Sequence, residues 1–159
     1  MKPKPFTPEP MDGKEPFIRD TTTNLVFHRC SLRTLYADVD RSQVVYHANY
    51  LRYFEFGRAS LMRDAAYSYR EIEDSGYVYP IVEIKVNYFN PLYYDDLMYI
   101  NTRVSEVERV RLCFEYIITH GETGAIVCKG FTRHCALNSS GIPVEVDEKT
   151  MYLWHIFPK

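Results

Sequence analysis

Apolar residues recur along this chain with two different periods, and the change from one to the other outlines its fold. From Asn24 to Tyr36, apolar and polar side chains alternate at every second position, which is typical of a strand with one buried face. Between Ala48 and Ala66 the apolar positions recur at helical spacing instead. One arc of this predicted helix carries Tyr50, Tyr53, Phe54, Gly57 and Leu61. Further apolar residues lie on the other arc, so we expect a curved sheet to cover the helix on more than one flank.

The later part of the chain returns to the period of a strand. Four strands are predicted, near residues 77–90, 97–109, 110–120 and 124–138, with turn-forming sequences between them. The segment 146–156 fits either a short helix or an edge strand. One strand, one long helix and four further strands predict an α+β fold, in which an antiparallel five-stranded sheet packs on a single central helix.

The first 22 residues have a different composition from the rest. They carry five prolines among charged residues and threonines, and they show no apolar period. Such a segment buries too little apolar surface to order itself, so we predict a flexible N-terminal arm over residues 1–22. The remaining residues, 23–159, have the length of one compact domain.

Charge and cysteine content exclude several classes of protein. The formal net charge of −2 and the pI of about 6.2 give no basic face for nucleic acid. The sequence has neither an apolar run long enough to cross a membrane nor the pattern of a signal peptide. Its four cysteines include no CxxC pair, so neither a metal site nor a disulfide framework is expected. We therefore expect a soluble protein of the cytoplasm with reduced thiols.

The connector between the first strand and the helix, residues 36–50, is the part with candidate chemistry. It holds Asp40 seven residues before His47, where the helix is predicted to begin. A helix start presents free backbone N–H groups and a positive dipole end, which favour a developing negative charge. A carboxylate on the preceding loop could face a carbonyl bound there. Spacing alone favours a simpler interpretation, in which Asp38 and Asp40 are turn or cap residues and His47 merely packs.

The sequence around the connector resembles a known family, and this resemblance favours the catalytic interpretation of Asp40. The connector reads Tyr-x-Asp-x-Asp from Tyr36 to Asp40, and Val-Val-Tyr-His-Ala-Asn-Tyr follows at residues 44–50. With Glu55 and Arg58 on the helix, it resembles the 4-hydroxybenzoyl-CoA thioesterase family, and within it the bacterial acyl-CoA thioesterases associated with the Tol–Pal system. Residues 82–88 and 90–96 extend the similarity to about residues 26–138. The resemblance implies a hotdog fold, a sheet wrapped around one long helix.

The resemblance also implies roles for individual residues. Asp40 takes the place of the catalytic aspartate, and the backbone N–H of His47 that of the group polarising the thioester carbonyl. Tyr46 and the His47 side chain would line the same pocket, with Tyr46 contacting substrate, and Asp38 would give structural support. Many relatives have glycine where this chain has Gln43, which leaves the conformation of the loop open.

A thioester suits such a minimal site. The departing thiolate has a parent pKa of about 8.5, so it needs little help from a general acid. The carboxylate would either attack the carbonyl or deprotonate a water molecule, and no cofactor or metal is needed. Glu55 and Arg58, three residues apart on the helix, are predicted to form a surface ion pair.

The resemblance implies pairing of the second strands across a two-fold axis, so a homodimer or homotetramer is expected. The implied activity is hydrolysis of acyl-CoA to a free carboxylic acid and CoA. Two alternatives stay open: hydrolysis of acyl-carrier-protein thioesters, and a non-catalytic module that binds acyl thioesters.

Overall fold

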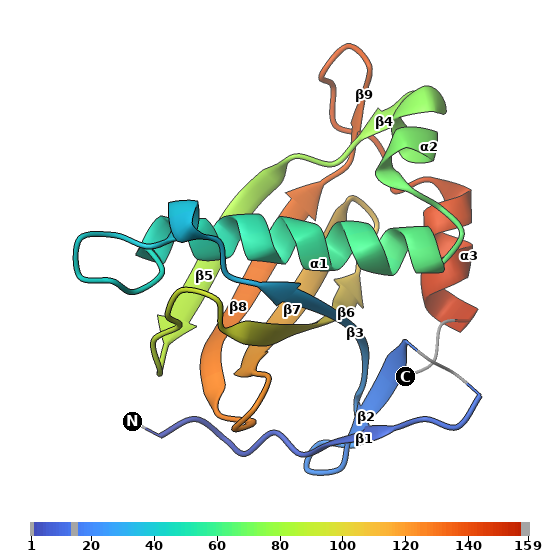
Figure 1. Cartoon of the computed structure of the whole chain (residues 1–159). Helices are drawn as coiled ribbons and strands as arrows, with labels where there is room; N and C mark the ends of the chain where they lie inside the picture. The colour runs from blue at the N-terminus through green and yellow to red at the C-terminus, as the bar shows by residue number, and fades with distance from the viewer. Residues whose placement is uncertain (1, 14–15, 157–159) are drawn as a thin grey trace.

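The computed structural model describes residues 2–13 and 16–156 (Figure 1). Within them, one sheet has seven antiparallel strands in the order β1-β2-β3-β6-β7-β8-β5, and a second has two, β4 and β9. The strands of the larger sheet are β1 (Pro8–Pro10), β2 (Phe17–Asp20), β3 (Val26–Arg33), β5 (Ile81–Tyr88), β6 (Leu97–Val107), β7 (Arg111–His120) and β8 (Ile126–Cys135).

The predicted hotdog fold is confirmed in the central part of this sheet. Strands β3, β6, β7, β8 and β5 form the five-stranded antiparallel layer, and it curves behind the helix α1 (Tyr50–Asp64) (Figure 1). Two one-turn helices, η1 (Tyr36–Asp38) and η2 (His47–Asn49), precede α1, and α2 (Tyr69–Asp74) follows it.

Two segments differ in detail from the sequence prediction. The strand expected over residues 77–90 is interrupted, giving β4 (Tyr77–Val78) and β5, because Pro80 has no N–H to donate to the sheet. β4 pairs with β9 (Leu137–Asn138). The segment 146–156, left open by its pattern, forms the helix α3 (Glu148–Ile156).

The prediction of a flexible arm over residues 1–22, with a domain beginning at 23, is wrong for the part of that segment that the structure describes. β1 pairs with β2, and β2 pairs with β3, so the sheet gains two strands at this edge. Phe6 and Ile18 are buried in a cluster with Phe27 and Ile126. Composition could not reveal this order, because these few apolar residues are buried by side chains of other strands.

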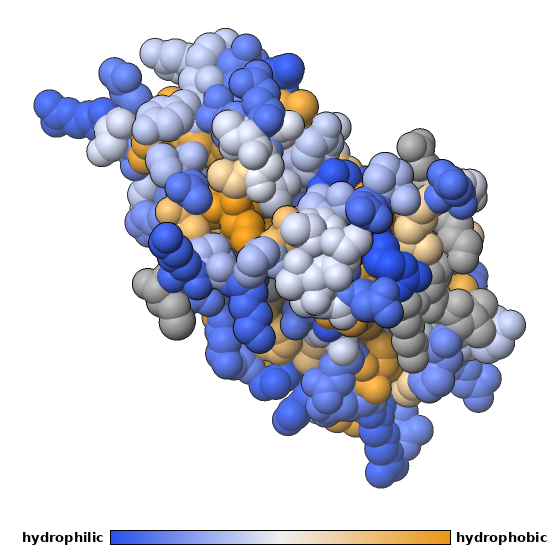
Figure 2. Space-filling model, turned by 90° about the horizontal axis from the view of Figure 1, so that it is seen from below, coloured by the Kyte–Doolittle hydropathy of each residue, from blue (hydrophilic) through white to orange (hydrophobic). Residues whose placement is uncertain are grey.

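The first and last described elements, β1 and α3, lie at different places on the body (Figure 1). The surface seen from the side of β1 and β2 is mostly hydrophilic with separate apolar patches (Figure 2). At the other end, Asp147 precedes α3 and accepts hydrogen bonds from the hydroxyls of Tyr79 (2.6 Å) and Tyr67 (3.0 Å). Trp154 of α3 meets the ring of Phe114 edge-on, with 6.4 Å between centroids. These contacts fasten α3 to the sheet.

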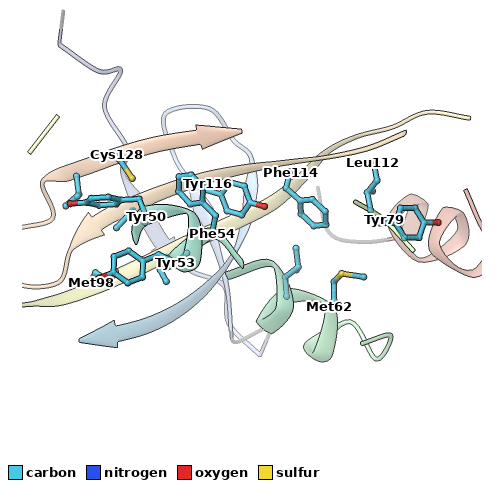
Figure 3. Close-up of a cluster of buried hydrophobic side chains, with 14 of the residues drawn as sticks. Tyr50, Tyr53, Phe54, Met62, Tyr79, Met98, Leu112, Phe114, Tyr116 and Cys128 are labelled. Carbon is cyan, nitrogen blue, oxygen red and sulfur yellow. The ribbon is translucent and has the colours of Figure 1, made fainter. Parts of the chain in front are cut away.

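Aromatic rings from α1 and from the sheet lie together in the core (Figure 3). Phe54 lies parallel to Tyr116 of β7, with 4.4 Å between ring centroids, and neither side chain is exposed beyond 1%. Gly130 of β8 leaves room for the Phe54 ring, since a Cβ at that position would overlap it. The helix can therefore approach the sheet closely at this point.

We expect Gly130→Ala to destabilise the protein by about 1–3 kcal/mol, because the added methyl group overpacks the Phe54 ring in a filled core. Urea unfolding measures the change, with Ser139→Ala in an exposed turn as the control. Equal stability of Gly130→Ala and wild type would show that Phe54 does not depend on this space.

Candidate functional site

The loop from β3 to α1 is fixed in place by Asp38. Its side chain is buried and accepts hydrogen bonds from the backbone N–H of Leu35 (2.9 Å) and the hydroxyl of Tyr53 (3.0 Å). Its backbone carbonyl accepts from the N–H of Tyr46 (3.0 Å) and the side-chain amide of Asn49 (2.8 Å). Asp38 thus ties both ends of the loop to the first turn of α1.

Asp40 sits at a tight turn within this loop. Its Oδ1 accepts the N–H of Ser42 at 2.7 Å, its own N–H donates to the carbonyl of Val44, and its carbonyl accepts from Gln43. Among the described residues, no hydrogen bond reaches its second carboxylate oxygen, and the side chain is half-buried. Asp40 can therefore stabilise the turn and still act as a catalytic group, because the turn uses only one of its two carboxylate oxygens.

Gln43 adopts the left-handed conformation, with φ of +66°. Glycine reaches this region without strain, whereas other residues pay roughly 1 kcal/mol or more for it. The loop therefore keeps a backbone shape suited to glycine although the residue is glutamine. The bridges between Val39 and Val45 and between Val44 and Tyr93 hold the chain in this conformation from both sides.

His47 is the first residue of η2, which leads directly into α1. The first N–H of a helix has no acceptor within the helix and lies at the positive end of its dipole. The carbonyl of His47 accepts a hydrogen bond from the Tyr88 hydroxyl (2.6 Å), which ties the helix start to the end of β5. Tyr46 and His47 are both exposed, and their rings lie 4.3 Å apart between centroids.

A surface hollow of about 250 Å³ opens beside His47. It lies between the loop, the start of α1 and the end of β5, and is lined by Val44, Val45, His47, Tyr50, Tyr88, Phe89, Asn90 and Pro91. Of the three predicted site residues, only His47 lines this hollow; Asp40 and Tyr46 lie on the same loop outside it. Sequence reasoning missed Tyr50 and Tyr88, which meet edge-on across it at 5.2 Å.

The prediction of a surface ion pair between Glu55 and Arg58 is wrong. Arg58 is buried, with only 9% of the residue exposed, and the hydroxyls of Tyr69 and Tyr116 lie beside its guanidinium. Arg58 is one helical turn beyond Phe54, so it continues the face that packs on the sheet. Its long side chain reaches polar groups there that the sequence pattern did not indicate.

His134 of β8 lies in the same buried region. Its Nδ1 bonds with the Tyr79 carbonyl at 2.8 Å, and its Nε2 lies 3.0 Å from the Thr132 hydroxyl. Burial lowers the pKa of His134 to about 4; the bond to Tyr79 opposes that shift, and the positive charge of Arg58 adds to it. The imidazole is therefore neutral at physiological pH.

Within residues 2–13 and 16–156, no three or more His, Cys, Asp or Glu side chains gather as a metal site would require. In the same residues, no helix is long and apolar enough to cross a membrane. All four cysteines are free thiols.

A hotdog sheet around one helix does not by itself assign a function, so the class of protein follows from comparison of the sequence with known families. The sequence model of the thioesterase-like superfamily matches residues 34–153, and the chain belongs to that family. By this homology it is a thioester hydrolase.

Particular relatives agree with this assignment. The chain is 31% identical to the putative acyl-CoA thioesterase YneP of Bacillus subtilis over 121 residues, which cover 76% of this chain and 86% of the relative. It is 27% identical over 99 residues to the acyl-CoA thioester hydrolase YbgC of Escherichia coli, covering 62% of this chain and 74% of the relative. The crystal structure of a probable thioesterase from Bartonella henselae superposes with a TM-score of 0.71 at 31% identity, covering 76% and 99% of the two chains.

Replacing Gln43 tests the strained loop. We expect Gln43→Gly to stabilise the protein by about 0.5–1 kcal/mol, because glycine adopts a positive φ without the Cβ clash. Gln43→Val should destabilise it, since a β-branched residue tolerates this region poorly. Urea unfolding ranks the three proteins, and a Gln43→Gly variant less stable than wild type would contradict the assigned strain.

His134 should make stability depend on pH. Because its folded pKa of about 4 lies below the unfolded value of 6.5, the unfolded chain binds more protons between these values. The contribution is therefore complete above pH 6.5 and is lost as the pH falls toward 4, by roughly 3 kcal/mol at most.

His134→Gln should flatten the fall in unfolding free energy between pH 6.5 and 4, measured against wild type by urea titration. His155→Gln, at an exposed position of α3, serves as the control and should keep the wild-type slope. An unchanged slope in His134→Gln would mean that this residue is not held neutral by burial.

Proposed function

We propose that this protein hydrolyses acyl-CoA thioesters to a free carboxylic acid and CoA, with Asp40 as the catalytic carboxylate and the His47 N–H as donor to the oxyanion. One observation carries the proposal: a single loop, fixed at both ends by Asp38, leads into the start of a helix and holds an Asp40 carboxylate oxygen that has no hydrogen-bond partner among the described residues. The names of YneP and YbgC support acyl-CoA as the thioester.

The chemistry needs few groups. In one route the Asp40 carboxylate attacks the carbonyl carbon, the carbonyl oxygen takes up negative charge beside the His47 N–H, and the C–S bond breaks to release CoA thiolate. Water then hydrolyses the acyl-aspartyl anhydride and restores the carboxylate. In the other route Asp40 takes a proton from a water molecule that attacks directly. Both routes yield the same products and use the same two groups.

Tyr46 and the His47 side chain would border the bound thioester. Both are exposed at the helix start and their rings are in contact, so they can cover one side of a ligand that reaches the His47 N–H. Their roles are in binding and positioning, because the transferred proton and the attacking atom belong to Asp40 or water.

The assembly we propose is a homodimer, formed through β5, with a homotetramer as its possible extension. Among the described strands, β5 ends the sheet and pairs with β8 alone, so its other edge is open. Val82 and Ile84 on this strand are 57% and 40% exposed. A second copy could add its β5 there in antiparallel register and cover these side chains. The unbridged cysteines are consistent with the cytoplasm as its compartment.

Asp40→Asn should reduce kcat for acyl-CoA hydrolysis by about 10²–10⁴-fold, because the amide can neither attack nor accept a proton. Asparagine still offers Oδ1 to the Ser42 N–H, so the turn and the melting temperature should be preserved. Release of free thiol from acetyl-CoA, benzoyl-CoA and octanoyl-CoA measures the rates.

Asp95→Asn is the matched control, since Asp95 is an exposed acid on the neighbouring loop whose positive φ suits asparagine. It should stay within about twofold of wild type. Full activity of Asp40→Asn would overturn the assignment of the carboxylate. Tight binding of acyl-CoA without turnover by wild type would favour a binding module instead, and hydrolysis of acyl-carrier-protein substrates alone would redefine the thioester.

A further inference from the structure

We propose that the N-terminal segment and the outer face of the sheet form a second binding site, whose ligand is a free aliphatic carboxylate of medium chain length. A surface hollow of about 310 Å³, here called the outer hollow, lies between residues 4–5, the turn from β2 to β3, and the strands β5, β7 and β8. It shares no lining residue with the hollow beside His47, so the inference does not rest on the proposed thioesterase function.

The outer hollow lies on the face of the sheet opposite to α1. Along β7, the residues Phe114, Tyr116 and Ile118 are buried in the core that α1 shares with the sheet. Side chains alternate between the two faces of a strand, so Glu115 and Ile117 point away from the helix. Both line the outer hollow.

The N-terminal segment forms one wall of the outer hollow. It passes beside β8 (Figure 1), where the Lys129 ammonium group donates a hydrogen bond to the carbonyl of Lys4 at 3.3 Å. Phe6 meets the ring of Phe27 edge-on, with 5.4 Å between centroids, and fixes the segment from the other side. These residues all precede residue 34, where the match to the thioesterase-like family begins, so the family assignment does not account for this wall.

The outer hollow has an apolar surface on which a hydrocarbon chain can lie. Four apolar side chains line it: Leu25, Phe27, Ile117 and Phe131. Phe27 is buried in the N-terminal cluster, and Leu25 and Ile117 pack against that cluster. Because this packing fixes their positions, they offer a preformed surface to a ligand. Hydrocarbon that covers this surface leaves water, which favours binding.

Three lysines give the same hollow positive charge. Lys4, Lys85 and Lys129 line it. Among the described residues, neither Lys4 nor Lys129 forms an ion pair. Lys85 lies 3.3 Å from Glu83, but that carboxylate also binds Arg133. The ammonium groups are therefore available to an anion.

The two acidic residues of the lining are already held by other partners. Asp20 is 1% exposed and accepts hydrogen bonds from the N–H of Thr7 (2.9 Å) and the hydroxyl of Thr23 (2.6 Å). Glu115 pairs with Arg103 at 2.7 Å. Their charges are thus stabilised without the lysines, and the balance of charge in the outer hollow favours an anion over a cation.

Size and charge together define the ligand. The compact ammonium group of lysine has three donors and no acceptor, which suits a single carboxylate. A cavity of about 150 Å³ holds the six carbons of benzene, so a hollow of about 310 Å³ suits a chain of roughly eight to twelve carbons. The N-terminal wall leaves room for one chain, and the formal net charge of −2 opposes binding to an anionic membrane. A free carboxylate therefore fits better than the headgroup of a membrane lipid.

The first test separates the contributions of chain and charge. Calorimetric titration of the full chain should show one octanoate bound per protein, with 1-octanol and acetate each binding at least tenfold more weakly. Vesicles of phosphatidylglycerol should not sediment the protein. Equal affinity for octanoate and 1-octanol would exclude a role for the lysines, and sedimentation with the vesicles would make a membrane lipid the ligand instead.

The second test removes the charge. Lys129→Gln and Lys85→Gln should each weaken octanoate binding by about tenfold, because each loses one charge-assisted contact. Lys149→Gln removes the same charge from an exposed position of α3 and should keep the wild-type affinity. Urea unfolding confirms that the variants are folded. Wild-type affinity in both Lys129→Gln and Lys85→Gln would overturn the inference.

The third test locates the ligand. Octanoate should shift the backbone amide resonances of Ile117, Lys129 and Phe131 in a nuclear magnetic resonance titration and leave that of His47 in place. Shifts confined to residues 36–50 would place octanoate at the candidate catalytic loop and exclude the outer hollow. None of these measurements uses thioester hydrolysis, so a failure of the proposed function would leave their result unchanged.

Discussion

The packing of the aromatic face of α1 against the sheet is the contact on which the rest of the structure depends. Phe54 lies flat on Tyr116, and the absence of a side chain at Gly130 lets it do so. This close approach sets the position of the helix start, and with it the position of the His47 N–H. Asp38 then joins the loop to that helix through Tyr53 and Asn49. The placement of Asp40 therefore depends on the core through Asp38, together with the bridges from Val39 to Val45 and from Val44 to Tyr93.

The fold could be predicted from the sequence where the spacing of apolar residues within one element matches the face that the element buries. The arc of Tyr50, Tyr53, Phe54, Gly57 and Leu61 is buried as its helical spacing indicated. The N-terminal strands could not be found in this way, because the burial of Phe6 and Ile18 depends on side chains of other strands, Phe27 of β3 and Ile126 of β8. Arg58 was misplaced for the same reason: polar partners in the core override the surface preference of a charged residue.

The candidate site was predictable only as far as the motif extends. Asp40, Tyr46 and His47 share one short loop, so a sequence pattern can carry them together. Other residues that shape the hollow beside His47, such as Tyr88 and Phe89, lie at the end of β5 and directly after it, some forty residues later, and the sheet brings them there. At Gln43, by contrast, the residue type does not predict the backbone conformation. Its positive φ is imposed by the neighbouring bridges and not by glutamine itself.

The two edges of the sheet are unequal, and this inequality limits how many copies can join. β1 occupies the edge opposite β5 and reads Pro8-Glu9-Pro10, so two of its three residues have no N–H to offer an incoming strand. In the seven-stranded sheet, strand addition can therefore proceed at β5 alone. Two chains that meet there would use the one receptive edge of that sheet in each chain, as far as its described strands go. A sheet that grows by this contact therefore stops at two chains. Repeating the same contact cannot build a fibre.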